Sequence, residues 1–289
     1  MEGPRGDDAC VGRLDVEAQE GWHRAISSFR ALSEQGPRVG LRIRYALVTP
    51  GVDLDEHLGP VDGGFFPALA DAAAAYRACF WPTDDRRNRA WIGLLIPLLK
   101  RAEPLMVERL SNAHQRAWPP EKIAIDVVEY ANFGGANTVV NPNHILMSSV
   151  APGFDGFGGI ECVFHEATHV FVGPRSGGSI AALSRAAERR GVILPRDLWH
   201  VVLFVSAGEA ARATIADLWN QPYEPYIDSQ GLFARAWPEL RTPVETWWLP
   251  YLHKEISLEE ASDGLVRALS EGATGLIHRS DAGLPSSDD

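Results

Sequence analysis

The stretch FHEATHV at residues 164–170 constrains the fold of this chain more than any other part of the sequence. It places two histidines four residues apart, with a glutamate after the first, inside an apolar run. A buried imidazole or carboxylate costs free energy unless a partner compensates it. The stretch therefore predicts a helix on which these polar side chains share a partner.

A helix over 159–171 would have two different faces, because each residue advances about 100° around the helix axis. The apolar face, suited to core packing, would hold Ile160, Val163, Phe164, Ala167, Val170 and Phe171. The opposite side would carry Cys162, His165, Glu166 and His169. A solvated helix face would normally carry Lys, Glu or Gln, so this second side favours a cleft.

The spacing of the two histidines suits a metal ion. Side chains at i and i+4 lie on the same helical face, so His165 and His169 can converge on one zinc at about 2.0–2.1 Å. Glu166 would lie beside the metal, where it can take a proton from water and return it to a leaving group. The alternative is that both histidines are structural and bind main-chain carbonyls. Cys162 is interpreted as a packing residue rather than a ligand.

A catalytic zinc site usually has three protein ligands. The helix predicted over 196–219 carries Glu209 among small and apolar neighbours, where a carboxylate needs a partner. His200 on the same helix is the rival ligand, and the two lie about 180° apart, so both cannot face one metal. We favour Glu209 as the ligand. His200 is then either a group that stabilises a developing oxyanion or a structural histidine.

HEATH followed downstream by GEAAR resembles the glutamate-type zincin metallopeptidases over about sixty residues. This resemblance implies a zincin-like fold with Zn²⁺ held by His165, His169 and Glu209 in a cleft between two lobes. It also implies that HILMSS at 144–149 is an edge strand along which a peptide substrate pairs.

The sequence departs from this family in two places. The family often has an acidic residue one turn after the third ligand, where Arg212 and Ala213 stand here, and the next acid is Asp217. The gap between the two ligand helices is also longer than is usual in the family. The family commonly supplies a tyrosine or histidine to the oxyanion, which makes Tyr226 the first candidate and Tyr223 the second. Further candidates are Tyr251 and His253.

Composition excludes some classes of protein. The net charge of −11 and the pI near 5.3 argue against nucleic-acid binding. No apolar window reaches about eighteen residues, and the N-terminal residues lack a secretory pattern, so no membrane association is expected. Three cysteines are too few and too scattered for a disulfide framework, which favours a reducing cytoplasm.

The order of predicted elements favours an α+β protein with two lobes. We expect a flexible N-terminus over 1–14, then an α+β lobe over 15–172 with a small mixed sheet, which ends in the motif helix. A helical lobe over 173–277 and a flexible C-terminus over 278–289 follow. The predicted strands are 40–48, 122–130 and two short strands within 137–149. The remaining predicted helices are 15–35, 66–79 (ending near Pro82), 85–116, 178–190, 229–239, 242–253 and 257–271.

These patterns together predict a zinc-dependent hydrolase, most simply a metallopeptidase acting on a peptide or protein substrate. Three alternatives remain open on the sequence. The first is a non-catalytic zincin relative that only binds zinc. The second is a metal-free α+β scaffold or interaction protein. The third is a hydrolase that uses the same zinc site to cleave a bond other than a peptide bond.

Overall fold

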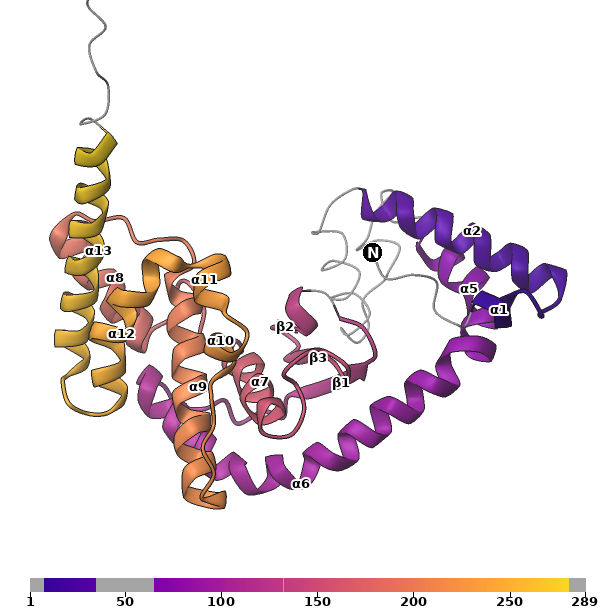
Figure 1. Cartoon of the computed structure of the whole chain (residues 1–289), viewed down its shortest axis with the longest axis horizontal. Helices are drawn as coiled ribbons and strands as arrows, with labels where there is room; N and C mark the ends of the chain where they lie inside the picture. Colours follow the sequence, from indigo (N-terminus) through magenta and orange to yellow (C-terminus); the bar gives the residue numbers. More distant parts are fainter. Residues whose placement is uncertain (1–7, 35–64, 132, 281–289) are drawn as a thin grey trace, which may run out of the picture. The chain divides into compact units, whose positions relative to one another are not determined.

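The computed structural model describes residues 8–34, 65–131 and 133–280 (Figure 1). The described part is mixed α+β and mostly helical, and it contains one three-stranded sheet. It divides into two compact units. The first comprises the described residues up to Gly93 together with Ile123–Val150, and the second comprises Leu94–Lys122 together with the chain from Ala151 onward. This division differs from the expected one, because the motif helix belongs to the unit that holds the later helices.

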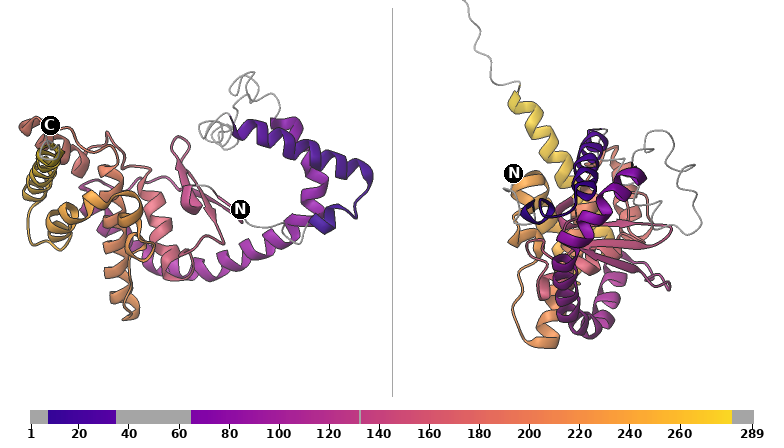
Figure 2. Two further views of the ribbon diagram at one scale, coloured as in Figure 1. Left: turned by 45° about the horizontal axis from the view of Figure 1, so that its top comes forward. Right: turned by 90° about the vertical axis from the view of Figure 1, so that its right-hand side faces the viewer.

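The first unit begins with helices α1 (Asp8–Val11) and α2 (Val16–Ser33). Helix α2 starts where predicted, because the side chain of Asp15 accepts a hydrogen bond of 2.8 Å from the N–H of Ala18 and so caps the helix. Helix α5 (Phe65–Ala75) lies alongside α2, as both views in Figure 2 show. Small buried alanines on both helices allow this close packing.

A short π-helix (Tyr76–Phe80) continues from α5 directly into the long helix α6 (Trp81–His114). The predicted helices over 66–79 and 85–116 are therefore present, but the predicted end near Pro82 is wrong. Pro82 is the second residue of α6, which directly follows the π-helix, and the helix continues through it. Pro97 and Pro104 both lie inside α6.

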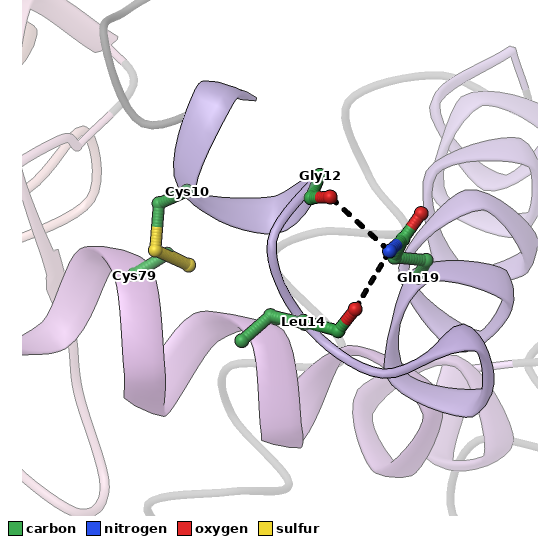
Figure 3. Close-up of a disulfide and its surroundings, with 5 residues drawn as sticks. All are labelled: Cys10, Gly12, Leu14, Gln19 and Cys79. Atoms are coloured by element: carbon green, nitrogen blue, oxygen red, sulfur yellow. Dashed lines mark hydrogen bonds between the residues drawn. A yellow bond between two sulfur atoms is a disulfide. The ribbon is translucent and has the colours of Figure 1, made fainter.

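One disulfide joins Cys10 on α1 to Cys79 in the π-helix, 69 residues apart in the sequence. Close to this bridge, the side-chain amide of Gln19 donates hydrogen bonds to the carbonyls of Gly12 and Leu14 (Figure 3). Part of the segment expected to be flexible over 1–14 is thus helical and covalently tied. A bridge closing a loop of this length stabilises a fold by about 4 kcal/mol. Disulfides persist in oxidising compartments, so this one does not favour the cytoplasmic expectation.

The sheet consists of β1 (Ala124–Val128), β2 (Ala136–Val139) and β3 (His144–Ser148) in the order β1-β3-β2. Strand β3 pairs parallel to β1 and antiparallel to β2. The strands predicted at 122–130 and within 137–149 are confirmed, whereas the strand predicted at 40–48 lies outside the described residues. The prediction that 144–149 forms an edge strand is wrong. The main chain of β3 is paired on both sides, so it is not available to an extended peptide.

The second unit contains most of the remaining helices. Helices α8 (Gly178–Arg190) and α9 (Leu198–Trp219) match the predicted ranges, and each ends at a residue in the left-handed conformation, Gly191 or Asn220. Two short helices, α10 (Tyr226–Ser229) and α11 (Leu232–Ala236), replace the helix predicted over 229–239. Helices α12 (Pro238–Leu252) and α13 (Leu258–Ser280) are both longer than predicted.

A single large hydrophobic core lies among α8, α9, α12 and α13. The indole of Trp248 is fully buried there and donates a hydrogen bond of 3.0 Å to the hydroxyl of Ser206. None of the helices in the described ranges combines the length and apolarity needed to cross a membrane.

Candidate metal centre

Helix α7 (Phe157–Thr168) carries the HEATH motif and confirms the predicted motif helix. The glycine-rich segment before it permits very close packing at its first turn. A Cβ atom added at Gly158 would lie 1.9 Å from the carbonyl oxygen of Gly153, and Gly153 itself has a φ of +81°. Only glycine fits these positions, because a side chain would overlap main-chain atoms or strain the backbone.

The two motif histidines converge as the i, i+4 spacing predicts. His169 caps the C-terminus of α7 and keeps helical dihedral angles (φ −57°, ψ −24°), so it stays one turn from His165. The Nε2 atoms of the two rings are 3.2 Å apart. Two nitrogens bound tetrahedrally to one zinc at about 2.0–2.1 Å would be roughly 3.3 Å apart. The pair is therefore spaced as a shared ion requires, although a hydrogen bond between the two rings has a similar length.

His200, in the first turn of α9, completes a group of three. Helices α7 and α9 pack against each other (Figure 1), and one ring nitrogen from each of His165, His169 and His200 lies within 4.8 Å of the other two. Within the described ranges, no other set of three or more His, Cys, Asp or Glu side chains meets this condition. The structure thus brings together the two motif histidines and the rival third ligand.

Glu209, the favoured third ligand, lies elsewhere. Its carboxylate forms an ion pair of 2.8 Å with Arg212 and lies 3.0 Å from Nε2 of His253. Because α9 is continuous from Leu198 to Trp219, Glu209 projects from the side opposite His200. The structure therefore places His200, and not the predicted Glu209, beside the two motif histidines. The sequence predicted that this carboxylate needs a partner, and in the structure that partner is Arg212.

The three imidazoles are neutral at pH 7. Burial, reinforced by the neighbouring imidazoles, lowers the pKa of His165 well below its usual 6.5. Burial also lowers the pKa of His169 to about 3 and that of His200 to about 4. A neutral imidazole keeps a lone pair, which is the form that binds metals. Nδ1 of His165 is buried and has no hydrogen-bond partner in the structure.

Aromatic side chains surround the three histidines. The ring of Phe204 lies 3.8 Å from that of His165 and 4.8 Å from that of His200, centroid to centroid. Trp199 and Trp237 approach His200 to 5.1 and 5.8 Å. Phe204 was not among the residues predicted from the sequence, although its position four residues after His200 places it on the same helical face. These rings give the centre a partly apolar surrounding, in which electrostatic interactions are stronger than in water.

Glu166 and Cys162 lie one turn apart on α7 and are both buried. Burial, together with the carboxylates of Glu161 and Glu166, raises the pKa of the Cys162 thiol well above its usual value of 9. Cys162 is not part of the three-histidine group, in agreement with its interpretation as a packing residue.

The structure separates the candidates for oxyanion stabilisation. Tyr251 donates a hydrogen bond of 2.9 Å to the carbonyl of Ala113, and His253 is engaged with Glu209. The hydroxyl of Tyr223 donates a hydrogen bond of 2.7 Å to Glu161. The ring of Tyr226, in contrast, stacks on Phe204 with centroids 6.4 Å apart. Tyr226 is therefore the candidate whose ring adjoins the aromatic side chains around the histidines.

Glu161 is a buried carboxylate that was not among the site residues predicted from the sequence. It lies on α7 one turn before His165 and is 1% exposed. Burial raises its pKa from the usual 4.5 to about 7, against the opposing effect of hydrogen bonds from Tyr223 and from the main chain of Tyr226. Glu209 was selected because it is an acidic residue within an apolar helix, where a carboxylate needs a partner. Glu161 has the same sequence context and could have been identified in the same way.

The raised pKa of Glu161 predicts a pH-dependent stability. The folded-state pKa of Glu161, about 7, exceeds the usual 4.5, so the protonated side chain adds to the free energy of unfolding. This stabilisation is fully present below about pH 4.5 and is lost as the pH rises to 7. Glu161→Gln has no proton to lose. Its free energy of unfolding, relative to the wild type, should rise by on the order of 3 kcal/mol between pH 4.5 and 8.

Urea unfolding of both proteins across this pH range measures the difference. Subtraction removes the contribution of the buried histidines, which both proteins share. The titratable groups that act on Glu161 are Tyr223, Asp228, Arg212 and the neighbouring Cys162. Parallel stability curves for the two proteins would show that the Glu161 carboxyl titrates normally.

Comparison of the chain with protein-family models, with curated proteins and with solved structures gave no match. The interpretation of this centre therefore depends on its residues and their geometry.

Proposed function

We propose that this chain is a zinc-dependent hydrolase, of the metallopeptidase type, in which His165, His169 and His200 hold the metal. The observation that carries the proposal is the convergence of three neutral imidazoles from α7 and α9, with ligand atoms within 4.8 Å of one another. Three-histidine sets that leave a fourth position for water are found in catalytic zinc sites. The fold we propose is zincin-like, with the motif helix followed by a helix that supplies the third ligand.

The donor set favours a catalytic site over a purely structural one. A closed structural zinc site has four protein ligands. Among the described residues, the group contains three histidines and no fourth His, Cys, Asp or Glu. Imidazole ligands without thiolate suit zinc but also other transition metals, and zinc is the metal that serves hydrolysis without redox chemistry.

Each residue has a defined task in the proposed reaction. Bound zinc would polarise the scissile carbonyl and lower the pKa of water in the site towards about 7. Glu166 takes a proton from the attacking water and delivers it to the amine nitrogen as the carbon–nitrogen bond breaks. Tyr226 donates a hydrogen bond to the carbonyl oxygen as negative charge develops on it. Burial raises the pKa of Tyr226 to about 12, so its hydroxyl is protonated and able to donate at neutral pH.

The proposed substrate is a peptide or protein. The cytoplasmic location expected from the sequence is not part of this proposal, because the Cys10–Cys79 disulfide is typical of oxidising compartments.

Metal content tests this proposal directly. Protein purified without chelators should contain about one zinc per chain, measured by inductively coupled plasma mass spectrometry. Removing zinc with a chelator should lower the melting temperature, and adding it back should restore it. At a free zinc concentration of 100 times Kd, the stabilisation should be about 2.7 kcal/mol.

Two outcomes would separate the alternatives. A protein without zinc, whose melting does not respond to zinc, would support the metal-free scaffold. A protein that binds one zinc but shows no turnover of a quenched-fluorescence peptide library would point to a zinc-binding protein or to a hydrolase of other bonds.

A further inference from the structure

The carboxylate of Glu161 connects the metal-site helix to the segment that carries Tyr226. Its Oε2 accepts two hydrogen bonds, one of 2.7 Å from the hydroxyl of Tyr223 and one of 2.9 Å from the main-chain N–H of Tyr226. Tyr223 lies in the segment between α9 and α10, and Tyr226 is the first residue of α10. A buried carboxylate that loses such donors pays its full desolvation cost, so the segment is strongly held against α7.

Close packing leaves this segment little room to move. A Cβ atom added at Gly208 on α9 would lie 2.6 Å from Cβ of Pro225 and 3.3 Å from Oε1 of Glu161. A Cβ at Gly153 would lie 2.9 Å from the ring of Tyr226. Glycines on α9 and in the loop before α7 therefore admit the segment to within contact distance, and Glu161 ties it in place.

The two tyrosines have different relations to Glu161. Tyr223 uses its hydroxyl for the hydrogen bond, so this hydroxyl is committed to the buried carboxylate. Tyr226 is held through its main chain, which fixes the start of α10 and leaves the phenol out of the interaction. The Tyr226 ring stacks on Phe204, and Phe204 packs on His165. A connected set of contacts thus runs from Glu161 to the side of the histidine group.

We propose that Glu161 is a positioning residue, which ties the Tyr223–Tyr226 segment to α7 and so holds the Tyr226 phenol on the Phe204 side of the three histidines. Its consequence for turnover rests on the proposed hydrolase function, whereas the tie itself does not. Glu161 does not contact the reacting atoms. It acts by fixing the donor that they use, and a displacement of about 1 Å at such a donor can lower the rate by about 100-fold.

The experiment compares four variants of the full chain. Glu161→Ala removes both hydrogen bonds, Glu161→Gln keeps an acceptor oxygen, and Tyr223→Phe removes one donor with little change in packing. Glu224→Ala is the matched control, because Glu224 lies in the same segment but is exposed. The first measurement is amide hydrogen exchange at Tyr226. Exchange should accelerate at least about tenfold in Glu161→Ala and remain near the wild-type rate in Glu161→Gln and Glu224→Ala.

Zinc content and turnover of the peptide library are the second and third measurements. All four variants should retain one zinc per chain, and kcat should fall by about 10- to 100-fold in Glu161→Ala with KM nearly unchanged. Glu161→Gln should recover most of this loss, which a general loss of stability would not explain. The kcat of Tyr223→Phe should lie between those of Glu161→Ala and Glu161→Gln. This variant also allows the test to be made if Glu161→Ala does not fold.

Failure of this inference is distinguishable from failure of the proposed function. Unchanged exchange at Tyr226 in both Glu161→Ala and Tyr223→Phe would overturn the tie, whatever the protein catalyses. Faster exchange with an unchanged kcat in an active, zinc-loaded variant would overturn the positioning role. A wild-type protein without zinc or turnover would refute the hydrolase proposal instead, and the exchange rates would still decide whether Glu161 holds the segment.

Discussion

Replacing His200 with alanine should abolish stoichiometric zinc binding, whereas replacing Glu209 with glutamine should leave one zinc per chain. The reason is the position of the two side chains on α9. His200 lies with the motif histidines, and Glu209 binds Arg212 and His253 on the opposite side of the helix. Loss of a residue that merely orients a metal ligand already costs about 10- to 100-fold in affinity, so loss of a ligand should cost at least about 100-fold.

Titration with Co²⁺, followed by its visible absorption, and zinc analysis of the purified variants measure this difference. His23→Ala is the matched control for a histidine replacement, because His23 is exposed on α2 in the other unit. Loss of zinc in Glu209→Gln together with retention in His200→Ala would restore the ligand set first predicted from the sequence and would contradict the structure.

Glu166→Gln should bind zinc as the wild type does and lose turnover by about 10²- to 10⁴-fold, the usual contribution of a general base. Glutamine preserves the size of the side chain but cannot accept a proton at neutral pH. His165→Ala should lose both zinc and turnover, because Nε2 of His165 lies 3.2 Å from Nε2 of His169 at the centre of the site.

Zinc content and kcat on the same peptide library distinguish the two effects. Glu188→Gln, an exposed position on α8, controls for the replacement of a glutamate. A circular dichroism melt of each variant checks that it is folded. Wild-type turnover in Glu166→Gln would mean that another group removes the proton, and the proposed role of Glu166 would have to be abandoned.

Elements with strong local signals were predicted well. Asp15 caps α2, left-handed residues end α8 and α9, and β2 and β3 flank the Asn-Pro-Asn turn. Errors occurred where long-range packing decides. The order β1-β3-β2 places β3 in the centre of the sheet, and the Cys10–Cys79 pair joins residues 69 apart. Neither strand order nor disulfide pairing follows from the local pattern of residues.

The residues of the candidate site also differ in whether local structure or long-range packing determines their positions. His165 and His169 lie one turn apart on one helix, so local hydrogen bonding sets their relative position, and the sequence alone was sufficient to predict that they converge. The third ligand depends on which side of α9 meets α7. Apolar residues lie all around α9, so its sequence contains no single stripe that identifies the side facing α7.

Tertiary packing alone decided between His200 and Glu209. Phe204 fits against His165, and Gly208 leaves room for Glu161 and Pro225, so the His200 side of α9 meets the motif helix. The spacing of HEATH was therefore enough to identify a pair of ligands, because a helical turn is a local structure. Completing the set required the fit between two helices, since that fit is determined by side chains brought together only in the folded chain.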